Sequence, residues 1–191
     1  MGEILSSLTP QLLVGIAVGA FASVVTLALL YAGLPVFGPV NDLINAVVGF
    51  VIALLAWQFF AAQPKSLPSV AGLLLCWAGV ALIIGNSVWV AFGRMDWKVG
   101  GMYTGIGYGL IGGWLLITLL FSSLAREFPP ALWWSGLVIG IALVFGLAAG
   151  PLLAERLSIK IQPLVWVAYG MTTLGWLGFP VWCWMLSRTL R

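Results

Sequence analysis

Residues 101–114 read GMYTGIGYGLIGGW, and glycine occupies every fourth position, at Gly101, Gly105, Gly109 and Gly113. Residues four apart lie on the same side of a helix, and glycine has no Cβ, so this side is bare backbone that another helix can approach closely. Close packing of this kind drives helix association in lipid. The stretch therefore predicts a central helix with a glycine face against a neighbour, either within one monomer or between two copies.

The composition places the chain in a membrane. Of 191 residues, 62% are hydrophobic and 7% are charged, whereas soluble domains carry about 25% charged residues. The net charge of +3 comes from only 13 charged residues, nearly all in the connections, so we expect no nucleic-acid partner. The lipid bilayer is the expected environment.

The ionisable residues argue against catalysis. The chain contains no histidine, which removes histidine-based acids, bases and metal ligands. No apolar run has an acid or a base in its interior, where an enzyme would need converging ionisable groups. We therefore expect no enzyme activity, no catalytic residue, no metal site and no cofactor.

Six apolar runs of about twenty residues account for nearly the whole chain and leave no room for a soluble domain. Thr9 and Pro10 are typical of an N-cap and a first helical residue. The predicted fold is an all-α integral membrane protein, a bundle of six transmembrane helices in one domain, 1–191. The expected spans are 11–31, 41–62, 69–92, 101–121, 132–153 and 164–186.

An even number of spans puts both termini on one side. Lys and Arg number four on each side of the predicted bundle, so they do not decide the orientation. We place the termini in the cytoplasm, because the basic tail directly follows the last span, and expect a multi-pass protein of a bacterial-type inner membrane. Residues 15–19 and 105–109 resemble each other at an offset of 90, as expected for a 3+3 inverted repeat.

Small residues at four-residue spacing also occur in other helices. Each pair predicts a close helix contact. Two prolines predict irregularities: Pro151 should bend or end the fifth helix, and Pro180 leaves the Trp176 carbonyl without its helical donor. Asp42 is interpreted as a cap at the membrane surface. The additional packing glycines are Gly15, Gly19, Gly136, Gly140, Gly146 and Gly150.

The eleven tryptophans divide into two groups. Eight fit interfacial belts, where amphipathic rings are favoured: Trp57, Trp133, Trp134, Trp182 and Trp184 on the termini side, and Trp89, Trp97 and Trp166 on the other. Trp77, Trp114 and Trp176 fall near the middle of their helices and should share one depth. They either fill space opposite the glycine face or line a pocket for a small apolar or aromatic ligand, with hydroxyls from Tyr108, Tyr169, Thr172 and Thr173.

Polar residues concentrate on the side away from the termini. Groups below the interface must be paired or hydrated. They either form a vestibule leading to the midplane tryptophans or bond to one another. The residues concerned are Asn41, Asp42, Asn45, Asn86, Ser87, Tyr103, Thr104, Tyr108 and Tyr169.

Size, span count and the small-residue face formed by Gly15, Gly19 and Ser23 resemble the membrane-embedded substrate-binding subunits of energy-coupling-factor vitamin transporters. The resemblance covers the architecture and one motif, so no functional residue is carried over.

Two functions remain open. The first, which we take as the main prediction, is a non-catalytic subunit or partner of a membrane complex, or a homo-oligomer, packing through small-residue helix faces. The second is a protein that binds or takes up a small molecule through an aromatic midplane pocket. Its expected ligand-binding residues are Trp77, Trp114, Trp176, Tyr108, Tyr169, Asn45 and Asn86.

Overall fold

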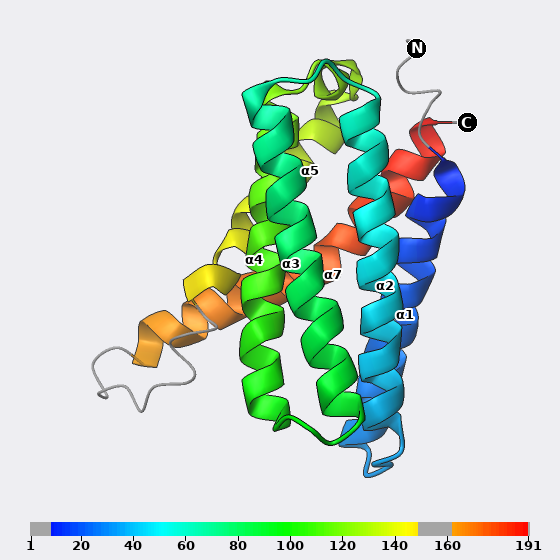
Figure 1. The fold of residues 1–191 in the computed structure, drawn as a ribbon, viewed down its shortest axis with the longest axis vertical. Helices are drawn as coiled ribbons and strands as arrows, with labels where there is room; N and C mark the ends of the chain where they lie inside the picture. The colour runs from blue at the N-terminus through cyan, green and yellow to red at the C-terminus, as the bar shows by residue number, and fades with distance from the viewer. Residues whose placement is uncertain (1–8, 149–161, 191) are drawn as a thin grey trace.

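The computed structural model describes residues 9–148 and 162–190, and it confirms the all-α bundle (Figure 1). Short connections join α1 to α2, α2 to α3, α3 to α4 and α4 to α5, and the last of these contains a 3-10 turn. The elements are α1 (Pro10–Tyr31), α2 (Phe37–Ala61), α3 (Leu67–Ala91), α4 (Trp97–Phe121), η2 (Leu124–Glu127), α5 (Pro130–Val144) and α7 (Gln162–Thr189).

The helices form a closed ring in chain order. Each long helix packs against the ones before and after it in the chain, and α7 returns to pack against α1. The start of α1 and the end of α7 lie at the same end of the molecule (Figure 1). α4 is the most buried of the candidate spans, with half of its most apolar window inside the protein.

Five helices of the described part are long and apolar enough to cross a membrane: α1 to α4, and Pro130–Ala148, which contains α5. α7 is the longest helix, with 28 residues. At 1.5 Å per residue it measures roughly 42 Å, more than the bilayer core of about 30 Å. α7 is not among the five, and in Figure 1 it crosses the bundle obliquely.

Several helix ends differ from the expected ones. Thr9 and Pro10 start α1 as predicted. α2 begins at Phe37 because Pro39 falls in its first turn, where a missing N–H costs no helical bond. Asp42 therefore lies in the second turn, and its interpretation as a cap was wrong. α4 starts at Trp97, in the expected loop, because Asp96 caps it by accepting from the Lys98 amide at 2.8 Å.

The fifth helix also ends earlier than expected. α5 stops at Val144, and a turn at Phe145 precedes a further helical stretch to residue 148. The predicted bend at Pro151 and the packing glycine Gly150 lie outside the described residues.

An aromatic core fills the termini end of the ring. Edge contacts link Trp114 to Phe59 at 5.7 Å, Phe59 to Phe128 at 6.4 Å, and Phe128 to Trp182 at 6.2 Å between ring centroids. Trp182 is fully buried, and its Nε1 donates to the Leu132 carbonyl at 2.9 Å. Its assignment to an interfacial belt was wrong, because α7 turns this side chain inward against α5.

The glycines of α4 do not form a single face. A Cβ at Gly109 would lie 2.8 Å from the Leu147 amide, but one at Gly113 would make ordinary contact with Leu75 of α3, at 3.4 Å. Gly101 meets no atom within 4 Å, which differs from its expected packing role. Residues four apart are rotated by about 40° on a 3.6-residue helix, so a twelve-residue stripe winds by about 120°. The stripe therefore divides between two neighbours.

The closest approaches of α4 use glycines outside the predicted stripe. A Cβ at Gly107 would lie 2.7 Å from the Gly79 carbonyl of α3. One at Gly112 would lie 2.8 Å from the Gly140 carbonyl of α5. α4 is thus held between two helices at near backbone contact.

Of the other predicted packing glycines that are described, all but the exposed Gly15 lie in close contact with a neighbouring helix. Gly15 and Gly19 of α1 face Val51 and Val48 of α2. A Cβ at any of three further glycines would meet its own chain: at Gly136 the Trp182 indole, at Gly140 the Leu116 side chain, and at Gly146 the Gly105 carbonyl. These close contacts lie within one monomer.

Candidate functional site: an apolar groove between α1 and α7

A groove of about 350 Å³ lies between α1 and α7. This volume falls within the range of small-molecule sites, about 300–1,000 Å³. The wall is apolar apart from two indole N–H groups. The lining residues are Ala17, Ala20, Phe21 and Val24 of α1, and Trp176, Leu177, Pro180, Val181 and Trp184 of α7.

The α7 wall is ordered by helical spacing and by a bond to α4. Trp176, Pro180 and Trp184 are four residues apart and share one side of the helix. The Trp176 Nε1 donates to the buried hydroxyl of Tyr108 at 3.0 Å, which holds the ring in place. Because proline lacks an N–H, the Trp176 carbonyl has no helical donor at Pro180.

The three midplane tryptophans do not converge. Trp77 is 43% exposed and stacks on Trp57 of α2, with ring centroids 6.0 Å apart. Trp114 is buried against Phe59, while Trp176 lies in the groove. Trp114 lines a separate small cavity between α2, α3 and α4, and Trp77 lines neither that cavity nor the groove. The positions of the three tryptophans near the middle of their helices did not bring their side chains together, because the side chains point in different directions around the bundle.

The polar residues of α1 and α2 bond to each other. The Ser23 hydroxyl lies 2.8 Å from the Oδ1 atoms of both Asn41 and Asn45, and Thr26 donates to Asn41 at 3.2 Å. Asn45 thus ties α1 to α2.

A second polar cluster ties α3 to α4. The Asn86 amide donates to the Gly100 carbonyl and to the Thr104 hydroxyl, both at 3.1 Å. The Ser87 hydroxyl donates to the Asn86 Oδ1 at 3.3 Å. Within the described residues, no buried side-chain nitrogen or oxygen lacks a partner. Mutual hydrogen bonding, the alternative to a vestibule, therefore accounts for Asn45 and Asn86.

Tyr169 lies apart from both clusters. It is 48% exposed, and its ring meets the edge of Trp166 on the same helix at 6.4 Å. Of the expected ligand-binding residues, only Trp176 lines the groove, with Tyr108 directly behind it.

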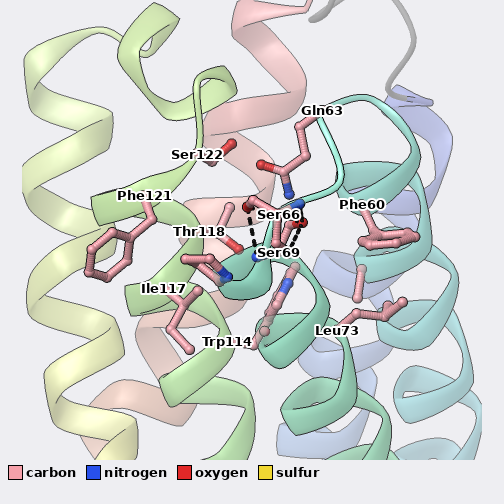
Figure 2. A pocket seen from close by; sticks show the side chains of 13 residues that line it. Phe60, Gln63, Ser66, Ser69, Leu73, Trp114, Ile117, Thr118, Phe121 and Ser122 are labelled. Atoms are coloured by element: carbon pink, nitrogen blue, oxygen red, sulfur yellow. Dashed lines mark hydrogen bonds between the residues drawn. The ribbon is translucent and has the colours of Figure 1, made fainter.

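A smaller polar cavity lies at the termini end, between α2, α3 and α4 (Figure 2). Its volume is about 10 Å³, enough for about one water molecule. Its polar lining comes from Gln63, Thr118, Ser122 and the two serines that cap α3 reciprocally, Ser66 and Ser69. Figure 2 shows the Trp114 ring extending toward these two serines. The cavity is too small for an organic ligand.

Most residues that line the groove could not be predicted from the sequence. The spacing of Trp176, Pro180 and Trp184 could have indicated one aromatic face on the last helix. Phe21 carries no signal of its own, because an apolar residue in a transmembrane helix faces lipid as often as protein. The contact of α1 with α7 joins residues more than 150 positions apart.

Searches among protein-family models, curated proteins and solved structures found no match to this chain.

Proposed function

We propose that this protein is a non-catalytic, multi-pass membrane protein that binds a small apolar or aromatic molecule in the groove between α1 and α7. The observation that carries the proposal is the groove itself, with a volume of about 350 Å³ and an almost wholly apolar wall. A ligand can reach it from the bilayer, because Phe21 and Val181 are 71% and 56% exposed.

The small-residue faces support the assembly role less well. Gly109 and Gly112 of α4 and Gly140 of α5 are occupied by the chain's own helices. They hold the bundle together and leave no room for a partner helix at those positions.

A groove-filling substitution tests the binding role. Ala17→Phe places a ring in the groove, and Ala28→Phe adds the same ring to an exposed position of α1 outside it. Native mass spectrometry of protein in a mild detergent would record adducts of 1-aminonaphthalene and of a fatty acid, used as aromatic and apolar probes. We expect Ala17→Phe to lose the adducts and Ala28→Phe to keep them. Equal retention by both variants would refute the groove as the site.

Assembly through a small-residue face has one specific observation in its favour. Ala81 and Gly85 lie on the exposed side of α3, four residues apart, between Trp77 and Trp89. A Cβ at Gly85 would meet nothing within 4 Å. A second helix could approach here as it does at other small-xxx-small pairs.

The mass of the protein in detergent distinguishes assembly through α3 from ligand binding by a monomer. Gly85→Leu blocks this face, and Gly101→Leu is the matched control, because Gly101 is also an open helical glycine. If assembly uses α3, Gly85→Leu converts a dimer or complex to monomer and Gly101→Leu does not. A monomer in the unmodified protein at all lipid contents would exclude self-association.

The orientation follows from the same topology. Lys and Arg number four at each end and do not decide the orientation, so we rely on the basic tail with Arg188 and Arg191, at and directly after the end of the last helix. We place the termini end in the cytoplasm of a bacterial-type cell. The native cysteines Cys76 and Cys183 are buried. Labelling of Lys65→Cys and Arg94→Cys variants with a membrane-impermeant maleimide in intact cells tests the orientation, since only the Arg94→Cys variant should react.

A further inference from the structure

The groove continues toward a cation at the membrane surface. Arg188 lies four residues after Trp184, on the same side of α7. Its guanidinium carbon lies 5.2 Å from the centre of the Trp184 ring, so the aromatic face holds the charge at the end of the groove. Arg188 forms no ion pair with any described residue.

The groove and Arg188 lie at depths that fit the tail and the headgroup of a lipid in one leaflet. The groove residues of α1, Ala17 to Val24, lie in the middle of that helix, while Arg188 is one residue from the end of α7. Trp176 and Arg188 are twelve residues apart, or roughly 18 Å along the helix, and they differ less than this in depth because α7 runs obliquely to the bundle. Half of a bilayer core is about 15 Å. A molecule that occupies both must be apolar over this length and anionic at one end.

The polar atoms available along the groove suit an ester-linked lipid. The Trp184 ring lines the groove and contacts Arg188, and its indole N–H has no hydrogen-bond partner among the described residues. It can donate to an ester carbonyl, which sits between the acyl chain and the phosphate. The Trp176 N–H is already engaged by Tyr108, so the deep part of the groove offers no side-chain donor.

From this arrangement we propose that the groove binds one acyl chain of an anionic glycerophospholipid from the termini-side leaflet, with its phosphate on Arg188. The inference rests on the proposed function, since it names the ligand class of the same groove. The apolar wall holds the chain, and Arg188 distinguishes anionic from zwitterionic headgroups through a charge that no described residue pairs.

The test compares two lipids with identical acyl chains. Phosphatidylglycerol and phosphatidylcholine are titrated separately onto the full chain in a mild detergent, and adducts are counted by native mass spectrometry. We expect phosphatidylglycerol to bind about fivefold more tightly, the factor contributed by one basic residue at an anionic membrane surface. Arg188→Gln should reduce phosphatidylglycerol binding to the level of phosphatidylcholine. Arg126→Gln, which removes an exposed cation of η2 at the same end, should leave the preference intact.

The variants separate the inference from the proposed function. Loss of both lipids in Ala17→Phe, together with equal binding of the two lipids by the unmodified protein, would retain the groove and overturn the anionic ligand. Lipid binding that Ala17→Phe leaves unchanged would overturn both.

A salt titration of the unmodified chain gives a measurement that needs no variant. The preference for phosphatidylglycerol should fall as ionic strength rises, because the phosphate contact is exposed and screened. A preference independent of salt, or one that Arg188→Gln preserves, would overturn the role of Arg188.

Discussion

At the scale of the residue, one hydrogen bond between Tyr108 and Trp176 fixes the position of a side chain that lines the groove. The Tyr108 hydroxyl is buried on α4 and accepts the indole N–H of Trp176 at 3.0 Å. Tyr108→Phe leaves that N–H unpaired while keeping the ring. Interhelical bonds in membranes contribute about 0.6 kcal/mol on average, so we expect a small loss of thermal stability in detergent and a clear weakening of ligand retention. Tyr103→Phe, which removes a hydroxyl with no partner among the described residues, is the control and should change neither.

The glycines of α4 give a second residue-scale prediction. Gly112→Ala would place a Cβ 2.8 Å from the Gly140 carbonyl, so the helices must separate, at a cost of about 1–3 kcal/mol. Gly101→Ala meets open space and should stabilise α4 by up to about 1 kcal/mol through helix propensity. Thermal unfolding in detergent measures both changes. A larger loss of stability for Gly101→Ala than for Gly112→Ala would contradict the open position of Gly101.

At the scale of the element, Asn86 joins α3 to α4 at the end away from the termini. Its amide reaches both the Gly100 carbonyl and the Thr104 hydroxyl. The effects of Asn86→Ala and Thr104→Ala on unfolding free energy should therefore not add, with a coupling of up to about 1.7 kcal/mol. The control cycle pairs Asn86→Ala with Thr173→Ala on α7, whose hydroxyl bonds only its own helix, and should be additive. Additivity in the first cycle would show that the two helices are held without this bond.

At the scale of the whole molecule, α7 closes the ring and contributes the largest buried side chain, that of Trp182. Trp182→Ala removes contacts with Phe128 and Phe179 and the bond to Leu132, so we expect a loss of about 3–5 kcal/mol. The melting transition should move down as one step, because the aromatic core connects α7 with α2 and α4. Trp134→Ala, at a position 61% exposed, provides the matched control and should change stability little. A separate early transition for α7 would show that the ring does not unfold as a unit.

The sequence by itself determined the membrane environment, the all-helical class and the approximate bounds of the helices. The signals for these features are local. They are the length of each apolar run, Pro10 in the first turn and the near absence of charge, and each can be recognised within one span without knowing which helix packs against it. It also indicated that Trp176 lacks a helical donor at Pro180, since that follows from proline chemistry alone.

Only the tertiary structure decided what each helix face meets. The glycine stripe of α4 is uniform in sequence, yet Gly109 contacts Leu147 just after α5, Gly113 faces α3 and Gly101 is open. Trp182 and Trp184 are two residues apart, and one is in the core while the other lines a groove. In lipid, an apolar side chain is as stable facing the acyl chains as it is facing another helix. Hydrophobicity therefore does not indicate which side of a helix faces inward. That choice depends on helix crossing and rotation, which arise from contacts between segments far apart in the chain.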